Sequence, residues 1–147
     1  LSNEENIEKY AKETDILVGA VLVPGAVAPK VVKKEIVEEM QKGSVIVDVA
    51  IDQGGCIETS KPTSHSKPTF EYKGVIHYAV PNIPGAFPQT ATLKLTEVTL
   101  PYVLEIANKD MNAVKENSVL KKGLNIIDGK IVYKPIADAH HFTFTEL

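Results

Sequence analysis

The stretch Ser44–Gly55, SVIVDVAIDQGG, decides the fold of this chain. Its first part, Val45–Ile51, is a short apolar run rich in β-branched residues, which is typical of a strand buried on both faces of a parallel sheet. The run stops at Asp52, and the backbone of Gly54 and Gly55 then permits close approach. Open α/β sheets bind ligands where buried strands end, so Asp52 is a candidate site residue. An ordinary polar turn is the alternative interpretation.

The totals for the whole chain exclude several classes of protein. Its 147 residues are enough for one domain, or part of one, with a real core. A net charge of -3 gives no basic surface for nucleic acid. The single cysteine, Cys56, cannot form an internal disulfide and fits a reducing cytoplasm. No apolar run approaches the roughly 18 residues of a membrane helix, and no signal peptide is evident. We therefore expect a cytoplasmic globular protein.

Two more apolar segments predict strands beside the first. They are Asp15–Val23 and Val75–Val80, and a helix predicted over residues 31–40 connects the first of them to the central strand. A strand–helix–strand unit of this kind makes its two strands parallel. Phe70–Tyr72 should pair with the last strand as a hairpin around Lys73-Gly74. The exits of all three buried strands should then open on one edge of the sheet.

The ends of the chain are predicted to be mostly helical. Ser2 has the spacing of an N-cap for a first helix. Residues 89–108 predict a long helix that Pro101 should kink or split, and residues 111–120 predict a weaker helix. The Asp128-Gly129 pair predicts a hairpin, followed by a short tail. The sequence as a whole is typical of an α/β protein.

The motifs of a complete nucleotide fold are missing. The sequence contains no G-x-G-x-x-G, no P-loop, and no acid placed after a first strand to hold a ribose. A complete dinucleotide fold has two halves, and this chain supplies only the second. Three strands would leave the inner edge of the sheet unpaired, which is a liability for an isolated chain. We therefore interpret the sequence as a portion of a larger domain.

The histidines and the cysteine do not predict a metal site. His65, His77, His140 and His141 lack ligand spacing with Cys56 or with the acids. His77 lies inside a predicted strand, which favours a packed core histidine over a catalytic one. Cys56 has few cationic neighbours, which favours a small buried thiol over a nucleophile.

The chain resembles the C-terminal part of bacterial alanine dehydrogenase from about Ser2 to Tyr133. Four stretches carry the resemblance: GAVLVPGAVAPKVV, GSVIVDVAIDQGGCIETSKPT, VIHYAVPNIPGAFPQTAT and LTEVTLPYVLEIAN. The related NAD-binding subunits of proton-pumping transhydrogenases usually have A-E-Q-G-G where this chain has Ile51–Gly55. The aspartate at position 52 therefore favours the dehydrogenase.

The resemblance implies a fold and a reaction. Residues 1–88 would be the second half of a Rossmann-type NAD-binding domain, with parallel strands and flanking helices. Residues 89–147 would be a long helix and a C-terminal helix and hairpin segment that returns to the substrate domain. The family converts L-alanine, NAD and water to pyruvate, ammonium and NADH, and works as a homohexamer. Its proton-transferring histidine, substrate-binding arginine, lysine and glycine-rich loop all lie upstream, so we expect activity only with a complementing N-terminal chain.

The resemblance also assigns site residues. Asp52 matches the family's catalytic aspartate at the nicotinamide end of the cofactor, and Ser2 matches a serine near the adenine. Lys61 stands where the family often has arginine, which keeps the charge and loses the planar fork. Pro81 removes a backbone donor from the usual V-A-N-M pattern. The full set of implied NAD contacts is Ser2, Val21, Leu22, Val49, Ala50, Ile51, Asp52, Lys61, Val80, Pro81, Asn82 and Ile83.

Two other functions remain as alternatives. One is a non-catalytic oligomerising or nucleotide-binding module that retains the fold without the reaction. The other is a transhydrogenase-like NAD-binding subunit, which Asp52 disfavours. An upstream reading frame encoding the missing half would favour the dehydrogenase over the non-catalytic module.

Overall fold

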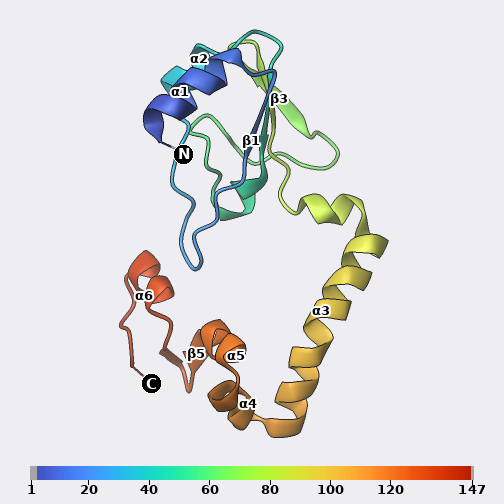
Figure 1. Ribbon diagram of the computed structural model, residues 1–147, viewed down its shortest axis with the longest axis vertical. Coiled ribbons are helices and arrows are strands. Elements are labelled where there is room, and N and C mark those ends of the chain that lie inside the picture. The colour runs from blue at the N-terminus through green and yellow to red at the C-terminus, as the bar shows by residue number, and fades with distance from the viewer. Residues whose placement is uncertain (1–2, 147) are drawn as a thin grey trace. The chain divides into compact units, whose positions relative to one another are not determined.

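The computed structural model describes residues 3–146 of the chain, which form two compact units. The first unit comprises residues 3–23 and 27–86 and contains the larger sheet. The second comprises residues 24–26 and 87–146 and consists mainly of helices (Figure 1).

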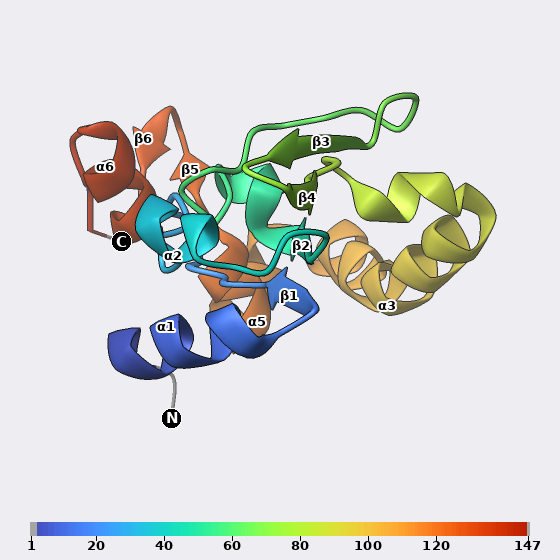
Figure 2. The same cartoon turned by 90° about the horizontal axis from the view of Figure 1, so that it is seen from above.

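The first unit is built on a four-stranded sheet in the order β1-β2-β4-β3 (Figure 2). β1 (Ile16–Gly19), β2 (Val45–Asp48) and β4 (Val75–Tyr78) run parallel. β3 (Thr69–Tyr72) pairs antiparallel with β4 across the turn at Lys73-Gly74, where both residues have positive φ. The predicted parallel strands and the predicted hairpin are therefore confirmed.

β1 and β2 are shorter than the sequence predicts. β1 ends at Gly19 rather than at residue 23, and β2 ends at Asp48 rather than at residue 51. After β2 the chain turns into the 3-10 helix η1 (Val49–Gln53), because Gly55 N donates to Ala50 O at 2.9 Å and closes the backbone on itself. Asp52 therefore lies in a helical turn and not at the end of an extended strand.

Two α-helices belong to the described part of the first unit. α1 (Glu4–Glu13) is capped by Asn3, whose Oδ1 accepts from Asn6 N at 2.8 Å, so the prediction of Ser2 as N-cap is wrong. α2 (Lys34–Glu38) is shorter than the predicted helix over residues 31–40. Val31 N and Val32 N both donate to Cys56 O, and these bonds keep the two valines extended.

The core of the first unit lies on one face of the sheet. α1 and α2 lie side by side in both views of the molecule. Their buried side chains form one apolar cluster with β2 and β4, whose members include Ala11, Val37, Met40, Ile46 and Val75. Burial of apolar surface of this kind is the main stabilising contribution to a small fold.

The opposite face of the same sheet is apolar and partly exposed. The strand register places Ile16, Val45 and Ile76 in one row across β1, β2 and β4. Val18 lies in the next row along β1, and the side chains of Ile16 and Val18 are each 60% exposed. Parallel sheets normally have both faces covered, so this unit resembles part of a larger domain.

The second unit contains the predicted long helix and differs from its prediction in two ways. α3 is one helix of 22 residues, so Pro101 does not split it, and the predicted kink at Pro101 stays a prediction. The predicted weak helix is two short helices, separated by Asn117, whose side chain caps the second. The tail forms a helix that the sequence did not predict. The elements are α3 (Pro88–Lys109), α4 (Met111–Glu116), α5 (Ser118–Gly123), β5 (Ile126–Ile127), β6 (Lys130–Ile131) and α6 (Lys134–His140).

No helix within residues 3–146 combines the length and the hydropathy needed to cross a membrane.

Ile46→Ala should lower the free energy of unfolding by about 2–5 kcal/mol, because Ile46 is fully buried and its truncation leaves a cavity. Ile16→Ala removes the same atoms from a 60% exposed side chain and should lower it by less than about 1 kcal/mol. Urea denaturation of both variants measures the difference. Equal losses would contradict the placement of the core on the helical face alone.

Candidate functional site

The exits of β1 and β2 form a hollow of about 220 Å³ at one edge of the sheet. The hollow has an aliphatic wall with polar groups from η1 at one side. Its lining residues are Ala20, Val21, Leu22, Val49, Ala50, Asp52 and Gln53. Predicted NAD contacts that follow β1 and predicted NAD contacts that follow β2 therefore line the same hollow. This is expected for parallel strands that end at the same edge of the sheet.

The exit of β4 joins this site through Asp52. Asp52 Oδ1 accepts a hydrogen bond from Asn82 N at 2.9 Å. Asn82 has a φ of 53°, in the left-handed region that asparagine tolerates better than most residues. Pro81 has no N–H, so Asn82 provides the first backbone donor after Val80, and the substitution of proline at position 81 leaves this bond intact.

Other predicted contact residues do not line the strand-exit hollow. Ile51 and Val80 are 4% and 0% exposed, so the protein itself covers nearly all of Ile51 and all of Val80. Ile83 is partly buried and begins the 3-10 helix η2 (Ile83–Ala86). The structure therefore places these residues near the strand exits without making their side chains part of the hollow.

One predicted residue, Lys61, lies apart from the strand-exit hollow. Lys61 lines a different hollow of about 420 Å³, and its Nζ lies 4.6 Å from the centroid of the Phe70 ring. The cation and the ring attract each other there. Ser2 lies outside the described residues, so its predicted place near an adenine has no structural description.

Gln53 is a polar residue of the hollow that the sequence analysis did not select. Its Oε1 is buried and has no hydrogen-bond partner among the described residues. Buried polar atoms normally have partners, so this oxygen is an acceptor available to a donor group of a ligand. In the sequence, the only sign that residue 53 could bind a ligand was a glutamine side chain between Asp52 and Gly54, and a surface turn explained that residue equally well.

The structure explains why Cys56 and His77 take no part in the site. Cys56 is fully buried, and burial raises the pKa of its thiol. His77 is also fully buried, with Nε2 2.8 Å from Thr59 Oγ1 and its ring stacked on Phe70. Burial lowers the pKa of His77. Their prediction as a buried thiol and a packed core histidine is confirmed. Within residues 3–146, no group of three His, Cys, Asp or Glu side chains is arranged to hold a metal ion.

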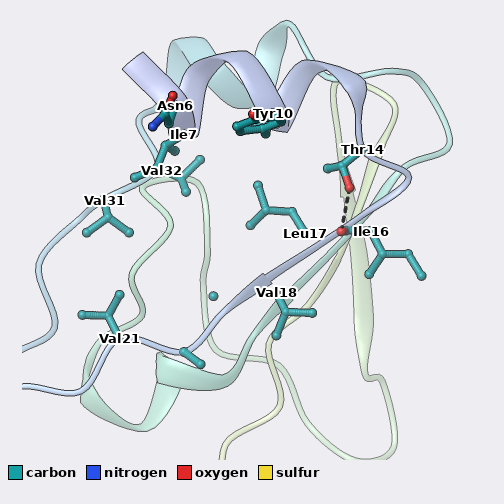
Figure 3. A pocket seen from close by; sticks show the side chains of 13 residues that line it. Asn6, Ile7, Tyr10, Thr14, Ile16, Leu17, Val18, Val21, Val31 and Val32 are labelled. Carbon is teal, nitrogen blue, oxygen red and sulfur yellow. Dashed lines mark hydrogen bonds between the residues drawn. The ribbon is translucent and has the colours of Figure 1, made fainter. Parts of the chain in front are cut away.

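A larger hollow of about 500 Å³ lies between α1 and β1 (Figure 3). Its labelled side chains are mostly apolar, and the hydrogen bond drawn there joins Thr14 Oγ1 to Ile16 O at 3.0 Å. Among the described residues β1 pairs only with β2, so its other edge is free. The hollow follows that free edge and shares Ala20 and Val21 with the strand-exit hollow, but it lacks the converging polar groups of a reaction site.

The family model for the alanine dehydrogenase/PNT C-terminal domain matches residues 1–134. The chain belongs to this family. It is 58% identical over 147 residues to an alanine dehydrogenase of Methanococcus maripaludis, covering 99% of this chain and 39% of that protein. It is 50% identical over 149 residues to an alanine dehydrogenase of Lysinibacillus sphaericus, covering 100% of this chain and 40% of that protein. This member of the alanine dehydrogenase/PNT family thus spans about 40% of the length of these relatives.

Solved structures agree with the family assignment. An L-alanine dehydrogenase matches with a TM-score of 0.77 and 51% identity, covering 94% of this chain and 38% of that one. A transhydrogenase from Sinorhizobium meliloti matches with a TM-score of 0.56 and 29% identity, covering 63% of this chain and 26% of that one. The predicted α/β fold, the second half of a Rossmann-type domain, is confirmed for this family member.

Acid should destabilise the chain through His77. The pKa of His77 is lowered in the folded state, so below the ordinary histidine value of 6.5 the unfolded chain binds the proton more readily. This contribution to stability is present above pH 6.5 and is lost as the pH falls through the lowered value. Urea midpoints measured from about pH 7.5 to pH 5 should show a fall that His77→Gln reduces and that exposed His65→Gln does not. Equal pH profiles for all three proteins would contradict this role.

Proposed function

We propose that this chain is the C-terminal portion of an alanine dehydrogenase, which converts L-alanine, NAD and water to pyruvate, ammonium and NADH. The observation that carries the proposal is the hydrogen bond between Asp52 Oδ1 and Asn82 N beside the strand-exit hollow. It fixes a carboxylate at the edge of the sheet where open α/β folds bind ligands. Relatives named alanine dehydrogenase that are 50–58% identical to this chain support the choice of reaction.

The residues of the hollow fit NAD in their chemistry. Val21, Leu22, Val49 and Ala50 would offer an aliphatic surface to the nicotinamide ring. The unpartnered Oε1 of Gln53 would accept from a donor such as a carboxamide. When bound, NAD supplies the hydride acceptor of the reaction.

Asp52 would act on the substrate side of the reaction. Its Oδ1 accepts from Asn82 N, and this is the only hydrogen bond of the carboxylate that the described residues show. The other oxygen can therefore accept from a substrate amine or from a water molecule. Asp52 is exposed, so a substrate can reach it. In this role the carboxylate orients the reacting nitrogen or water and exchanges a proton with it.

The remaining groups of the reaction would come from an N-terminal segment, on this chain or on another. The partly exposed apolar face at Ile16, Val18 and Ile76 and the free edge of β1 support such a partner. Exposed apolar side chains along α3, such as Leu93 and Val98, support self-association into a homo-oligomer. We place the assembled enzyme in the cytoplasm, in keeping with the single, buried cysteine of this chain.

Complementation tests this proposal. The 147-residue chain is expressed alone, and also with the N-terminal part of the Methanococcus maripaludis relative that it does not cover. We expect alanine-dependent formation of NADH only in the mixture or in a fusion of the two parts. A folded, assembled fusion without activity would contradict the proposal and would favour a non-catalytic module.

Asp52→Asn in the complemented enzyme should lower kcat by about 100-fold or more, because the amide cannot take up a proton. The KM for NAD should change by less than about 3-fold, because the proposed role is at the reacting end. Steady-state kinetics with varied alanine and NAD measure both values. Asp128→Asn, an exposed position in the turn between β5 and β6, is the matched control and should leave both unchanged. An unchanged kcat in Asp52→Asn would contradict the assignment.

A further inference from the structure

We propose that Lys30 and Asp48 are positioning residues for Asp52, because they hold the turn that follows it from opposite sides. Neither side chain lines the strand-exit hollow, so both would act through the backbone of residues 54–57. The inference rests on the proposed function, since the position of Asp52 affects turnover only if Asp52 works at the reacting centre.

Lys30 binds the turn through its carbonyl groups. Its Nζ donates to Gly54 O at 2.5 Å and to Gly55 O at 2.8 Å, across a separation of 24 and 25 residues. The side chain is only partly exposed, and hydrogen bonds from a cation are stronger than neutral ones. The backbone near Lys30 follows the same turn, because Ala28 N donates to Gln53 O at 2.9 Å.

Asp48 binds the turn through its N–H groups. It is fully buried at the end of β2, and its carboxylate accepts from Cys56 N at 3.1 Å and from Ile57 N at 3.2 Å. No lysine within residues 3–146 forms an ion pair with it. A buried carboxylate is strongly destabilising unless hydrogen bonds replace its water. The N–H groups of Cys56 and Ile57 replace that water. The buried carboxylate therefore needs the turn for its hydrogen bonds, and the turn is also held by the carboxylate.

The two side chains match the polarity of the backbone that they bind. A cation takes two successive carbonyls, and an acid takes the two N–H groups that follow. Glycine is required at position 55, where φ is +77° and an added Cβ would lie 2.7 Å from Asp48 Oδ2. The sequence, the backbone conformation and the two charged side chains therefore specify one shape for this turn.

The clamp formed by Lys30 and Asp48 reaches Asp52 through η1. Gly54 N donates to Ile51 O at 3.0 Å, and Gly55 N donates to Ala50 O at 2.9 Å. The clamped turn thus fixes the residues on both sides of Asp52. Releasing the turn should let η1 shift and weaken the bond from Asn82 N. A catalytic group that moves by about 1 Å can lose about 100-fold in rate.

Lys30→Met and Asp48→Asn test the clamp in the complemented enzyme. Each should lower kcat by about 10-fold or more while changing the KM for NAD by less than about 3-fold. The controls are Lys33→Met and Glu71→Gln, which remove the same charges from exposed side chains that bind nothing in the described chain. Both controls should keep the parent kinetics.

Hydrogen exchange provides a readout that does not need activity. In the full 147-residue chain, the backbone N–H of Asn82 should exchange about 10-fold or more faster in both clamp variants, because its acceptor, Asp52 Oδ1, is no longer held in place. The amides of β2 that pair with β1 and β4 should keep the parent rates. A purely structural role predicts the opposite pattern, with faster exchange throughout the sheet.

The outcomes separate the clamp from the proposed function. An inactive parent enzyme overturns the function, and exchange at Asn82 then still decides whether the clamp holds Asp52. The clamp is overturned if Lys30→Met keeps both the kcat and the Asn82 exchange rate of the parent. It is also overturned if exchange becomes faster across the whole sheet. If Asp48→Asn does not fold, Lys30→Met decides, because Lys30 is partly exposed and outside the core cluster.

Discussion

The site depends on the hydrogen bond from Asn82 N to Asp52 Oδ1, which joins the exits of β2 and β4. The bond can form only because the two strands pair in parallel and end at the same edge of the sheet. It holds the Asp52 carboxylate in place beside the aliphatic strand-exit hollow. The clamp of Lys30 and Asp48 extends the same constraint to the turn after Asp52. A rigid, pre-oriented acceptor of this kind is what a reacting centre needs.

The fold supports this site from one side only. The apolar core holds β2 and β4 on the face of the sheet that α1 and α2 cover, whereas the other face is apolar and partly exposed. Parallel sheets in complete domains are covered on both faces. The proposed N-terminal segment would therefore do two things at once. It would cover the open face and the free edge of β1, and it would bring the missing acid, base and phosphate-binding groups to Asp52.

The sequence predicted the parallel strands and the hairpin, because β-branched runs and glycine turns act locally. Asp52 was selected by its place after the central strand, whereas the other residues of the hollow came from the family resemblance, and their contacts with NAD stay predictions. The sequence predicted β2 too long, because the hydrogen bond from Gly55 N to Ala50 O ends the strand and apolar composition does not reveal that bond. It overextended α2 because the bonds to Cys56 O override the helical pattern at Val31 and Val32. The clamp was not predicted, because Lys30 reaches carbonyls 24 residues away and Asp48 looks like part of an ordinary strand.

A crystal structure of the complemented protein with bound NAD would show directly whether the strand-exit hollow and Asp52 form the nicotinamide site. We expect the nicotinamide ring in the hollow lined by Val21 and Ala50, with the Asp52 carboxylate beside the reacting face and still bonded to Asn82 N. A nicotinamide ring bound elsewhere, for example in the hollow around Lys61, would contradict the proposed role of the strand-exit hollow. An Asp52 carboxylate turned away from the ring would contradict the proposed role of Asp52.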